Sequence, residues 1–563
     1  MQVGRVISLL LSGAAAAALA LAGIAAVPTA QPAVAAASDQ VYEVHYVPTV
    51  GDAVIRVEVW RDASYDARRQ PVILTYSPYN SLSEPETARD SVGETFVPKG
   101  YARAVADVLG TRGSTGCWDY GGPREQQSGV DVVKWLADRR WSNGKVAMIG
   151  GSYNGTTASM VAARGADVPE LRAIVPIAGI SRWYGYAYGN GVRYFLNSKV
   201  PSDEGFDTPL GFDFGFAKTV AADPMGQTFA DTIRDKAAEC GAIEHTEEGY
   251  ARNPDYDRFW LRRDYRKDAR DFRAAVLLAH GWQDYNVKQE EGLELFRRIP
   301  VDRPATRAVE GVPFKIMHLT QGSHSGATNG PRWNDLLERF LARTLKGRRT
   351  GIAQAGPVIT QGRTSAGAGE FTTAADYPLP RTRSTRLWLR HGGRLTARQD
   401  RTGRIASYRE TGTSAEEAPL VSGLGYRSAP LARATRLVGS AVFRAKVRVS
   451  SETMHLTPVL VDIAPDGTTR TIERGFLHLD YRNGLQADQP ATGRWLSAAV
   501  RLLPQDYTVA AGHRIGLRVQ SSNTIWAVPG NPGTVDIAQG SLRNVARGSS
   551  LTIPTIRSPA RFR

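Results

Sequence analysis

Hydrophobic and polar positions follow two rhythms along the chain, and each rhythm predicts a different kind of element. Over residues 41–60 the two kinds of side chain alternate, as they do in half-buried antiparallel strands. Beyond these residues, short apolar runs at 71–76, 101–107 and 145–149 alternate with stretches of helical spacing such as 131–137. Apolar strands that alternate with helices are typical of a parallel α/β sheet. The same rhythm predicts strands at 173–178, 275–279 and 314–318, and helices at 158–164 and 333–345.

The α/β rhythm is interrupted once and later ends. Residues from about 181 to 271 are aromatic and polar and have helical spacing only in patches, which predicts a helical cap inserted into the α/β domain. After residue 350 helical spacing nearly vanishes, and short alternating segments such as 441–449 predict a β-sandwich or jelly roll. We therefore expect an α/β domain at 38–350 and a β-sandwich at 351–563.

The first 37 residues have the pattern of a secretory signal peptide. Arg5 precedes an apolar run at 6–27, and the Ala-x-Ala patterns at 33–35 and 35–37 are typical cleavage sites. The alternative is an uncleaved membrane anchor, because the run is long enough to span a bilayer. With cleavage, we expect a secreted, extracellular protein with no stable membrane association.

Composition and charge narrow the class of protein. A hydrophobic fraction of 42% and an aromatic fraction of 9% exclude a mainly disordered chain. The net charge of +15 is uneven, because residues 351–563 hold 28 Lys and Arg against 14 Asp and Glu, whereas the preceding residues are nearly neutral. Of those 28 basic residues only Lys446 is a lysine, and the arginines are scattered rather than gathered in a block. This pattern argues against a nucleic-acid partner and favours a solvated β surface, with weak contact to anionic cell-wall material as the alternative.

The two cysteines, Cys117 and Cys240, could form one disulfide bond in an oxidising compartment. Their separation fits no metal-binding motif, and we expect neither a metal nor an organic cofactor.

Candidate chemistry begins at residues 150–155, Gly-Gly-Ser-Tyr-Asn-Gly, which lie between a predicted strand and a predicted helix. Small residues at this spacing allow the sharp turn that presents Ser152 as a nucleophile at the start of a helix. A serine needs a base, and the usual chain order on such a fold is serine, acid, histidine. Asp284 and His324 each follow a predicted strand. The other histidines after Ser152 in this domain are less suitable, since His280 and His318 belong to apolar strands and His245 to the cap.

These motifs resemble those of the Xaa-Pro dipeptidyl-peptidases and their cocaine-esterase-like relatives. The resemblance covers the elbow at 150–155 and the segments 141–147, 178–184, 280–288 and 321–324. It implies an α/β-hydrolase with a helical cap and a C-terminal jelly roll. It also implies an acyl-enzyme on Ser152, with Asp284 as the orienting acid and His324 as the base. Tyr79 resembles the family's oxyanion-hole tyrosine, which would act together with the Tyr153 backbone N–H.

The resemblance also implies a substrate class, namely peptides with proline at the second position. Glu204 would bind the free amino terminus, and Trp183 and Tyr186 would form walls of the proline pocket. The chain lacks the large N-terminal domain of the longer Xaa-Pro peptidases, with only about 40 residues between the signal peptide and the Tyr79 strand. A cocaine-esterase-like hydrolase or an α-amino-acid ester hydrolase or acylase is therefore the alternative enzyme. The non-enzyme alternative is a wall-binding protein with a degenerate hydrolase domain.

Overall fold

A computed structural model of the chain describes residues 39–80, 86–194, 254–300, 315–330, 332–413, 423–487, 492–543 and 545–556. The predicted signal peptide, most of the predicted cap, Glu204, Cys240 and His245 lie outside the described residues. None of the described helices has the length and apolar character needed to cross a membrane.

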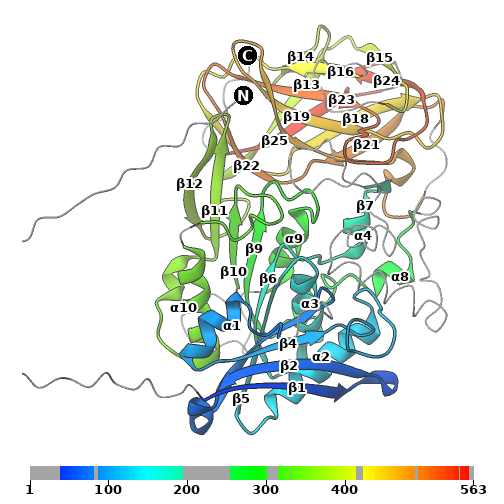
Figure 1. The fold of residues 1–563 in the computed structure, drawn as a ribbon. Coiled ribbons are helices and arrows are strands. Elements are labelled where there is room, and N and C mark those ends of the chain that lie inside the picture. The colour runs from blue at the N-terminus through cyan, green and yellow to red at the C-terminus, as the bar shows by residue number, and fades with distance from the viewer. Residues whose placement is uncertain are drawn as a thin grey trace, which may run out of the picture. The chain divides into compact units, whose positions relative to one another are not determined.

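The first described half is built on one mixed sheet (Figure 1). Its N-terminal strands pair antiparallel, and the remaining strands pair parallel, as the two hydrophobic rhythms predict. In spatial order they are β1 (Gln40–Pro48), β2 (Val54–Asp62), β4 (Ala102–Asp107), β3 (Gln70–Ser77), β5 (Ser142–Gly151), β6 (Leu171–Ile177), β9 (Ala275–Gly281) and β10 (Lys315–Thr320). The prediction of an α/β fold is therefore confirmed.

Helices cover both faces of this sheet because alternate strand residues enter two different cores. Val146 and Met148 of β5 contact the core that includes helices α2 (Pro123–Ala137), α3 (Tyr153–Ala162) and α9 (Glu290–Arg298). Ala147 and Ile149 enter the opposite core, with α1 (Ser91–Phe96) and α10 (Trp333–Lys346). Two strand faces that are both apolar are the normal state of a parallel sheet covered by helices.

Two helix boundaries differ from the predicted ones. Helix α2 begins at Pro123, eight residues before the predicted start, because its first turn carries polar side chains that mask the helical spacing. Helix α3 begins at Tyr153, directly after Ser152, where glycine and asparagine lower the helix propensity that sequence patterns detect. Two short helices, α4 (Trp183–Ala187) and α8 (Arg258–Leu261), frame the undescribed part of the predicted cap.

The second half is strand-rich and has a separate core, as predicted. We call residues 358–556 the β-domain. Its strands are β11 (Val358–Thr364), β12 (Gly367–Ala374), β13 (Thr382–Arg390), β14 (Arg394–Thr396), β15 (Arg404–Glu410), β16 (Leu424–Arg427), β17 (Thr435–Gly439), β18 (Val442–Val449), β19 (Thr457–Ile463), β20 (Thr469–Arg474), β21 (Leu496–Arg501), β22 (Gln505–Val509), β23 (Arg514–Gln520), β24 (Gly533–Gln539) and β25 (Ser550–Ile556).

One strand belongs to both halves. Strand β11 continues the α/β sheet by pairing parallel with β10, and its last two residues pair with β22 of the β-domain. The main-chain hydrogen bonds of the α/β sheet therefore run on into the β-domain (Figure 1).

Candidate active site

Ser152 lies at a sharp turn between β5 and α3. Its backbone has φ 57° and ψ −124°, a left-handed conformation that is strained for a side chain other than glycine. The turn needs glycine on both sides. A Cβ on Gly150 would lie 2.3 Å from the Cβ of Asn154, and one on Gly155 would lie 2.9 Å from the carbonyl oxygens of Gly150 and Ile177. The spacing of glycines around the serine therefore reflects a backbone that tolerates no larger residue.

Asp284 and His324 meet beyond the carboxyl ends of β9 and β10. The Nδ1 of His324 lies 2.8 Å from the Oδ2 of Asp284, which is fully buried. Because a carboxylate only accepts, Nδ1 carries the proton and Nε2 is the nitrogen that can accept one. The other carboxylate oxygen of Asp284 accepts the backbone N–H of Val287 at 2.9 Å, which fixes the acid within its own loop.

His280 is a second partner of Asp284 that the sequence argument assigned to the core. Its Nε2 lies 3.3 Å from Asp284 Oδ2 and 2.8 Å from the carbonyl oxygen of Val287. Burial disfavours the ionised form of Asp284, but the positive charge of His324 and the hydrogen bonds from both histidines hold its pKa below its usual value. The position of His280, four residues before Asp284, could have indicated this contact. The apolar strand around His280 instead favoured a core position.

Tyr79 joins the nucleophile to the helix that follows it. Its hydroxyl donates to Ser152 Oγ at 3.3 Å and accepts the backbone N–H of Tyr153 at 3.2 Å. Burial raises the pKa of Tyr79, so the hydroxyl keeps its proton and remains a donor. The Tyr79 loop is held in turn, because Asn80 donates from Nδ2 to the buried carboxylate of Asp107 at 2.7 Å.

A fully buried carboxyl group lies beneath Tyr153. The Tyr153 hydroxyl lies 2.9 Å from each carboxylate oxygen of Glu125, and Trp118 donates its indole N–H to the same hydroxyl at 2.9 Å. Glu125 also accepts the backbone N–H of Gly121 at 2.8 Å. Burial raises the pKa of Glu125 to about 8, so it is mostly neutral at pH 7. Nothing in the sequence singled out Glu125, since an acid in the first turn of a helix normally faces solvent.

The two aromatic residues expected at the proline pocket lie next to the elbow. Trp183 and Tyr186 are buried, and their rings meet edge to face with centroids 5.9 Å apart. Trp183 also contacts the ring of Tyr153 at 5.4 Å and donates its indole N–H to the hydroxyl of Tyr265 at 3.0 Å. The Tyr186 hydroxyl donates to the Asn286 side-chain oxygen at 3.2 Å, two residues beyond Asp284. Glu204, the expected partner of the substrate amino group, lies outside the described residues.

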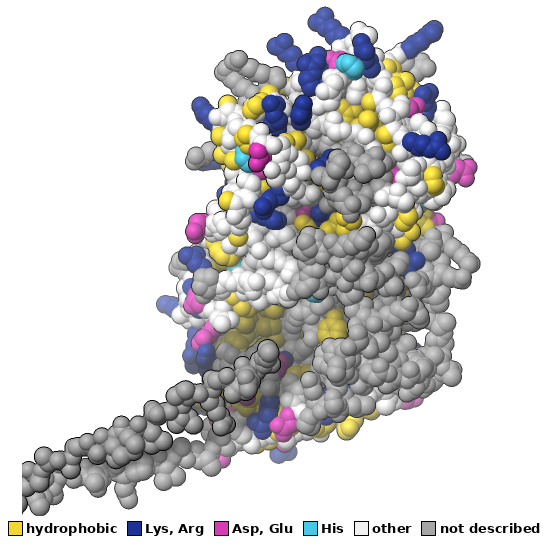
Figure 2. Space-filling view, turned by 45° about the horizontal axis from the view of Figure 1, so that its top comes forward, with side chains coloured by type: hydrophobic (Ala, Val, Ile, Leu, Met, Phe, Trp, Pro, Cys, Tyr) yellow, Lys and Arg dark blue, Asp and Glu magenta, His cyan; other side chains and the backbone are white. Residues whose placement is uncertain are grey.

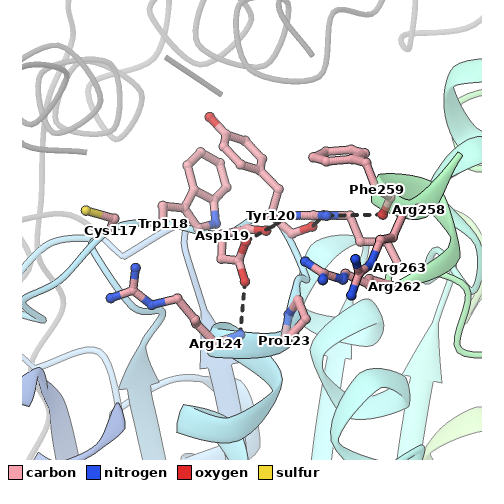
Figure 3. Close-up of a pocket in the computed structure, with 10 residues that line it drawn as sticks. All are labelled: Cys117, Trp118, Asp119, Tyr120, Pro123, Arg124, Arg258, Phe259, Arg262 and Arg263. Atoms are coloured by element: carbon pink, nitrogen blue, oxygen red, sulfur yellow. Dashed lines mark hydrogen bonds and ion pairs between the residues drawn. The ribbon is translucent and has the colours of Figure 1, made fainter. Parts of the chain in front are cut away.

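A cavity of about 510 Å³ opens beside the loop that connects β4 to α2 (Figure 3). Cys117, on its lining, is disulfide-bonded, and the only other cysteine of the chain, Cys240, lies outside the described residues. Asp119, also on the lining, accepts a hydrogen bond from Arg263 at 2.8 Å and one from the Arg124 backbone N–H at 3.0 Å. Within the described part of the chain, no group of three or more His, Cys, Asp or Glu side chains could hold a metal ion.

The β-domain contacts the loop that carries Asp284. Glu473 accepts hydrogen bonds from the Tyr285 hydroxyl at 3.3 Å and from the Gln289 side chain at 3.1 Å. The guanidinium carbon of Arg474 lies 4.5 Å from the centre of the Tyr285 ring. The β-domain therefore holds Tyr285, the residue after Asp284, in place.

Comparison with known proteins relates both halves of the chain to known families. Residues 51–326 match the family model of the X-Pro dipeptidyl-peptidase (S15 family), and residues 350–547 match that of the X-Pro dipeptidyl-peptidase C-terminal non-catalytic domain. A Streptomyces avermitilis protein provisionally named Xaa-Pro dipeptidyl-peptidase is 29% identical over 451 residues, which cover 72% of this chain and 60% of that protein. The Xaa-Pro dipeptidyl-peptidase of Lacticaseibacillus rhamnosus is 32% identical over 280 residues, 46% of this chain and 32% of the relative.

Solved structures establish the fold. A CocE/NonD family hydrolase from Staphylococcus aureus superposes with a TM-score of 0.75 at 17% identity, covering 92% of this chain and 94% of the other. An α-amino acid ester hydrolase superposes with a TM-score of 0.69, also at 17% identity, covering 94% and 99%. The α/β-hydrolase fold with a C-terminal β-domain is therefore shared along nearly the whole chain, and with both domain models matched in order, the chain belongs to the X-Pro dipeptidyl-peptidase S15 family.

Proposed function

We propose that the chain is a secreted serine exopeptidase that releases Xaa-Pro dipeptides from peptide N-termini. The observation that carries the proposal is the position of the Tyr79 hydroxyl, 3.3 Å from Ser152 Oγ and 3.2 Å from the Tyr153 N–H, in a fold that also pairs His324 with Asp284. Nucleophile, base, acid and two oxyanion donors are the groups that acyl transfer requires. Family membership supports the peptide substrate.

In the proposed first step, His324 accepts the Ser152 proton on Nε2 while Oγ attacks the carbonyl carbon of the proline residue. The Tyr79 hydroxyl, which donates to Oγ in the resting site, and the Tyr153 N–H then donate hydrogen bonds to the new oxyanion. As the tetrahedral intermediate collapses, the peptide C–N bond breaks and His324 gives its proton to the leaving amine. Asp284 stabilises the histidinium throughout.

In the second step, water attacks the acyl-enzyme. His324 takes a proton from that water, and the ester bond to Ser152 breaks as the proton returns to Oγ. The dipeptide leaves with a free carboxylate. Only side chains and backbone groups of the chain take part, and the proposed steps use no cofactor.

Substrate selection in this proposal depends on two features of the acyl side. The proline ring would pack near Trp183 and Tyr186, whose rings lie against Tyr153 and Asn286 around the elbow. The substrate ammonium group would pair with Glu204, as the resemblance to the family implies. Because the charged amino group would be bound at a fixed distance from the nucleophile, the bond after the second residue is the one that would be cleaved.

A chromogenic Ala-Pro anilide tests the proposal. We expect hydrolysis of the free anilide, a large loss of rate for its N-acetylated form, and no turnover by Ser152→Ala. Hydrolysis of simple esters without cleavage of the anilide would instead identify the alternative, a cocaine-esterase-like or α-amino-acid ester hydrolase. Failure of a fluorophosphonate to label Ser152 would overturn both.

Secretion is a separate part of the proposal and rests on residues 1–37. We expect the protein to accumulate in the culture medium and its N-terminus, read by sequencing, to follow one of the two Ala-x-Ala sites. Retention of the full chain in the membrane fraction would identify the apolar run as an anchor.

A further inference from the structure

The exposed residues of the β-domain have a larger excess of basic over acidic side chains than the domain as a whole. Among its described residues sixteen arginines are exposed, against four exposed acidic residues, Glu370, Asp376, Glu452 and Asp466. Four other acidic residues, Glu410, Asp462, Glu473 and Asp506, are buried, whereas Arg474 is the only buried Lys or Arg of this described part. Figure 2 shows Lys and Arg side chains projecting from the end of the β-domain that carries β14 and β16 in Figure 1.

The fold gathers arginines that are far apart in the sequence. The segment 391–404 lies against the loop 540–547, because the Gly403 N–H donates to Ser541 at 2.8 Å and the Gln399 side chain donates to the Ser541 hydroxyl at 3.1 Å. The other side of the same segment meets β16, where the Arg427 N–H donates to Gly393 at 2.8 Å. These contacts bring together the exposed residues that we call the arginine patch: Arg394, Arg398, Arg401, Arg404, Arg427 and Arg543.

Two members of the patch face each other directly. Arg394 of β14 and Arg427 of β16 are register partners, and both are exposed. Like charges opposite each other on neighbouring strands destabilise a sheet. The only acidic residue of the segment 391–404, Asp400, is ion-paired with Arg390, outside the patch. Among the described residues, the one acidic side chain of this segment is therefore engaged outside the patch, and the patch keeps its positive charge.

A hollow of about 310 Å³ opens beside this pair. Arg427 and Arg518 line it together with the apolar side chains of Val461 and Leu517. Gly392 and Gly425, two of its lining residues, have nothing within 4 Å of where a Cβ would be, so the main chain at these two positions is open to an approaching group. The patch thus combines fixed positive charge with an accessible, recessed surface.

The chemistry of the patch indicates which anion it fits. Every member is an arginine, whose planar guanidinium binds phosphate oxygens in pairs and is less strongly hydrated than an ammonium group. Proteins that bind single-stranded nucleic acids stack the bases on exposed aromatic side chains. Among its described residues, the β-domain has no exposed Phe, Tyr or Trp side chain. Backbone phosphates without bases therefore match the patch best.

We propose that the arginine patch binds a flexible polyanion with phosphate groups along its backbone, the chemistry of envelope polymers such as poly(glycerol phosphate). This function is independent of the peptidase site. It would hold a secreted enzyme at an anionic surface while the catalytic face stays free. Since each bound phosphate releases counterions, binding weakens steeply as salt increases.

The test uses the full-length mature protein, fluorescent poly(glycerol phosphate) and a triple variant, Arg398→Gln, Arg401→Gln and Arg404→Gln. The matched control removes the same three charges elsewhere on the β-domain, by Arg383→Gln, Arg470→Gln and Arg501→Gln. We expect the patch variant to bind at least tenfold more weakly and its log–log salt slope to fall by about 2, at roughly 0.7 per lost phosphate contact. The control should bind as the parent does, and both variants should keep the parent's rate on a chromogenic peptide.

Three results would overturn the proposal. Equal weakening in both variants would mean that net charge alone attracts the polymer. No binding by the parent at physiological salt would mean that the patch has no such ligand. Tighter binding of a single-stranded oligonucleotide with the same number of phosphates would identify a nucleic acid as the partner.

Discussion

Glu125 receives the hydroxyl of Tyr153 between its two carboxylate oxygens, each 2.9 Å away. Tyr153 supplies a backbone N–H next to the nucleophile, and its ring reaches down into the core, where Trp118 donates to the same hydroxyl. The position of that N–H therefore depends on a buried carboxyl group that does not touch the predicted substrate site. Glu125 is a positioning residue in this sense.

We expect Glu125→Ala to lower kcat about tenfold and the free energy of unfolding by about 3 kcal/mol. The change leaves the Tyr153 hydroxyl and the Gly121 N–H without their acceptor, and each unsatisfied buried group costs about 1–3 kcal/mol. Glu125→Gln keeps an acceptor for Tyr153 and should restore most of kcat. The control is Gln127→Ala on the same helix, whose side chain reaches Asp131 rather than the elbow. An unchanged kcat in Glu125→Ala would refute the positioning role.

The same residue predicts a pH dependence of stability. Burial raises the pKa of Glu125 from 4.5 to about 8, so the folded state holds a proton that the unfolded state has lost. An acidic group whose pKa is higher in the folded state than in the unfolded state makes the fold progressively less stable as the pH rises from about 4.5 to about 8. We expect the difference in unfolding free energy between Glu125→Gln and the parent to grow by up to ~1.4 kcal/mol per pH unit across that window. Denaturant titrations at pH 5, 6, 7 and 8 measure this difference, and parallel curves would contradict it.

Tyr79→Phe tests the oxyanion hole. Removal of one preorganised donor lowers kcat by about 10²–10³-fold, because the interaction is made fully only with the transition state. KM should change little, since the phenyl ring remains in place. Tyr65→Phe is the control, because its hydroxyl donates to Pro98 at the surface. A loss of less than fivefold in steady-state kcat for Tyr79→Phe would assign the oxyanion to other donors.

His280→Leu tests the second partner of Asp284. Loss of a hydrogen bond to a buried carboxylate costs about 1.5–3 kcal/mol, so we expect kcat to fall at least tenfold as Asp284 orients His324 less firmly. His318→Leu on the adjacent strand is the matched control, since that histidine is equally buried and packs against Trp333 and Phe371. Both variants should lose stability, and only His280→Leu should lose kcat. Equal effects on kcat would make His280 an ordinary core residue.

Sequence patterns predicted those parts of the molecule that depend on local spacing. The elbow could be predicted because its turn requires glycine at Gly150 and Gly155, and Asp284 and His324 because both follow apolar strands. Spatial contacts between distant segments could not be predicted in this way. Glu125 looks like a solvated helix residue, and its role depends on a tyrosine 28 positions away. His280 was assigned to the core because its strand is apolar, although it also contacts the acid.

The arginines of the β-domain give the same lesson at the surface. Their scatter along the chain favoured a solvated β surface and gave no sign of a cluster. Main-chain contacts of Gly403 with Ser541 and of Arg427 with Gly393 instead place several of them at one end. Periodicity reports which side of a strand faces solvent, and it carries no information on which loops meet.

Strand β11 limits how such an enzyme can be divided. A chain cut after α10 would leave β10 as the last strand of a parallel sheet, with the buried residues Ile316, Met317 and Leu319 beside an unpaired edge. Long apolar edges of this kind recruit strands from other molecules. A partner domain for the α/β region must therefore supply its own strand beside β10, in the place of β11.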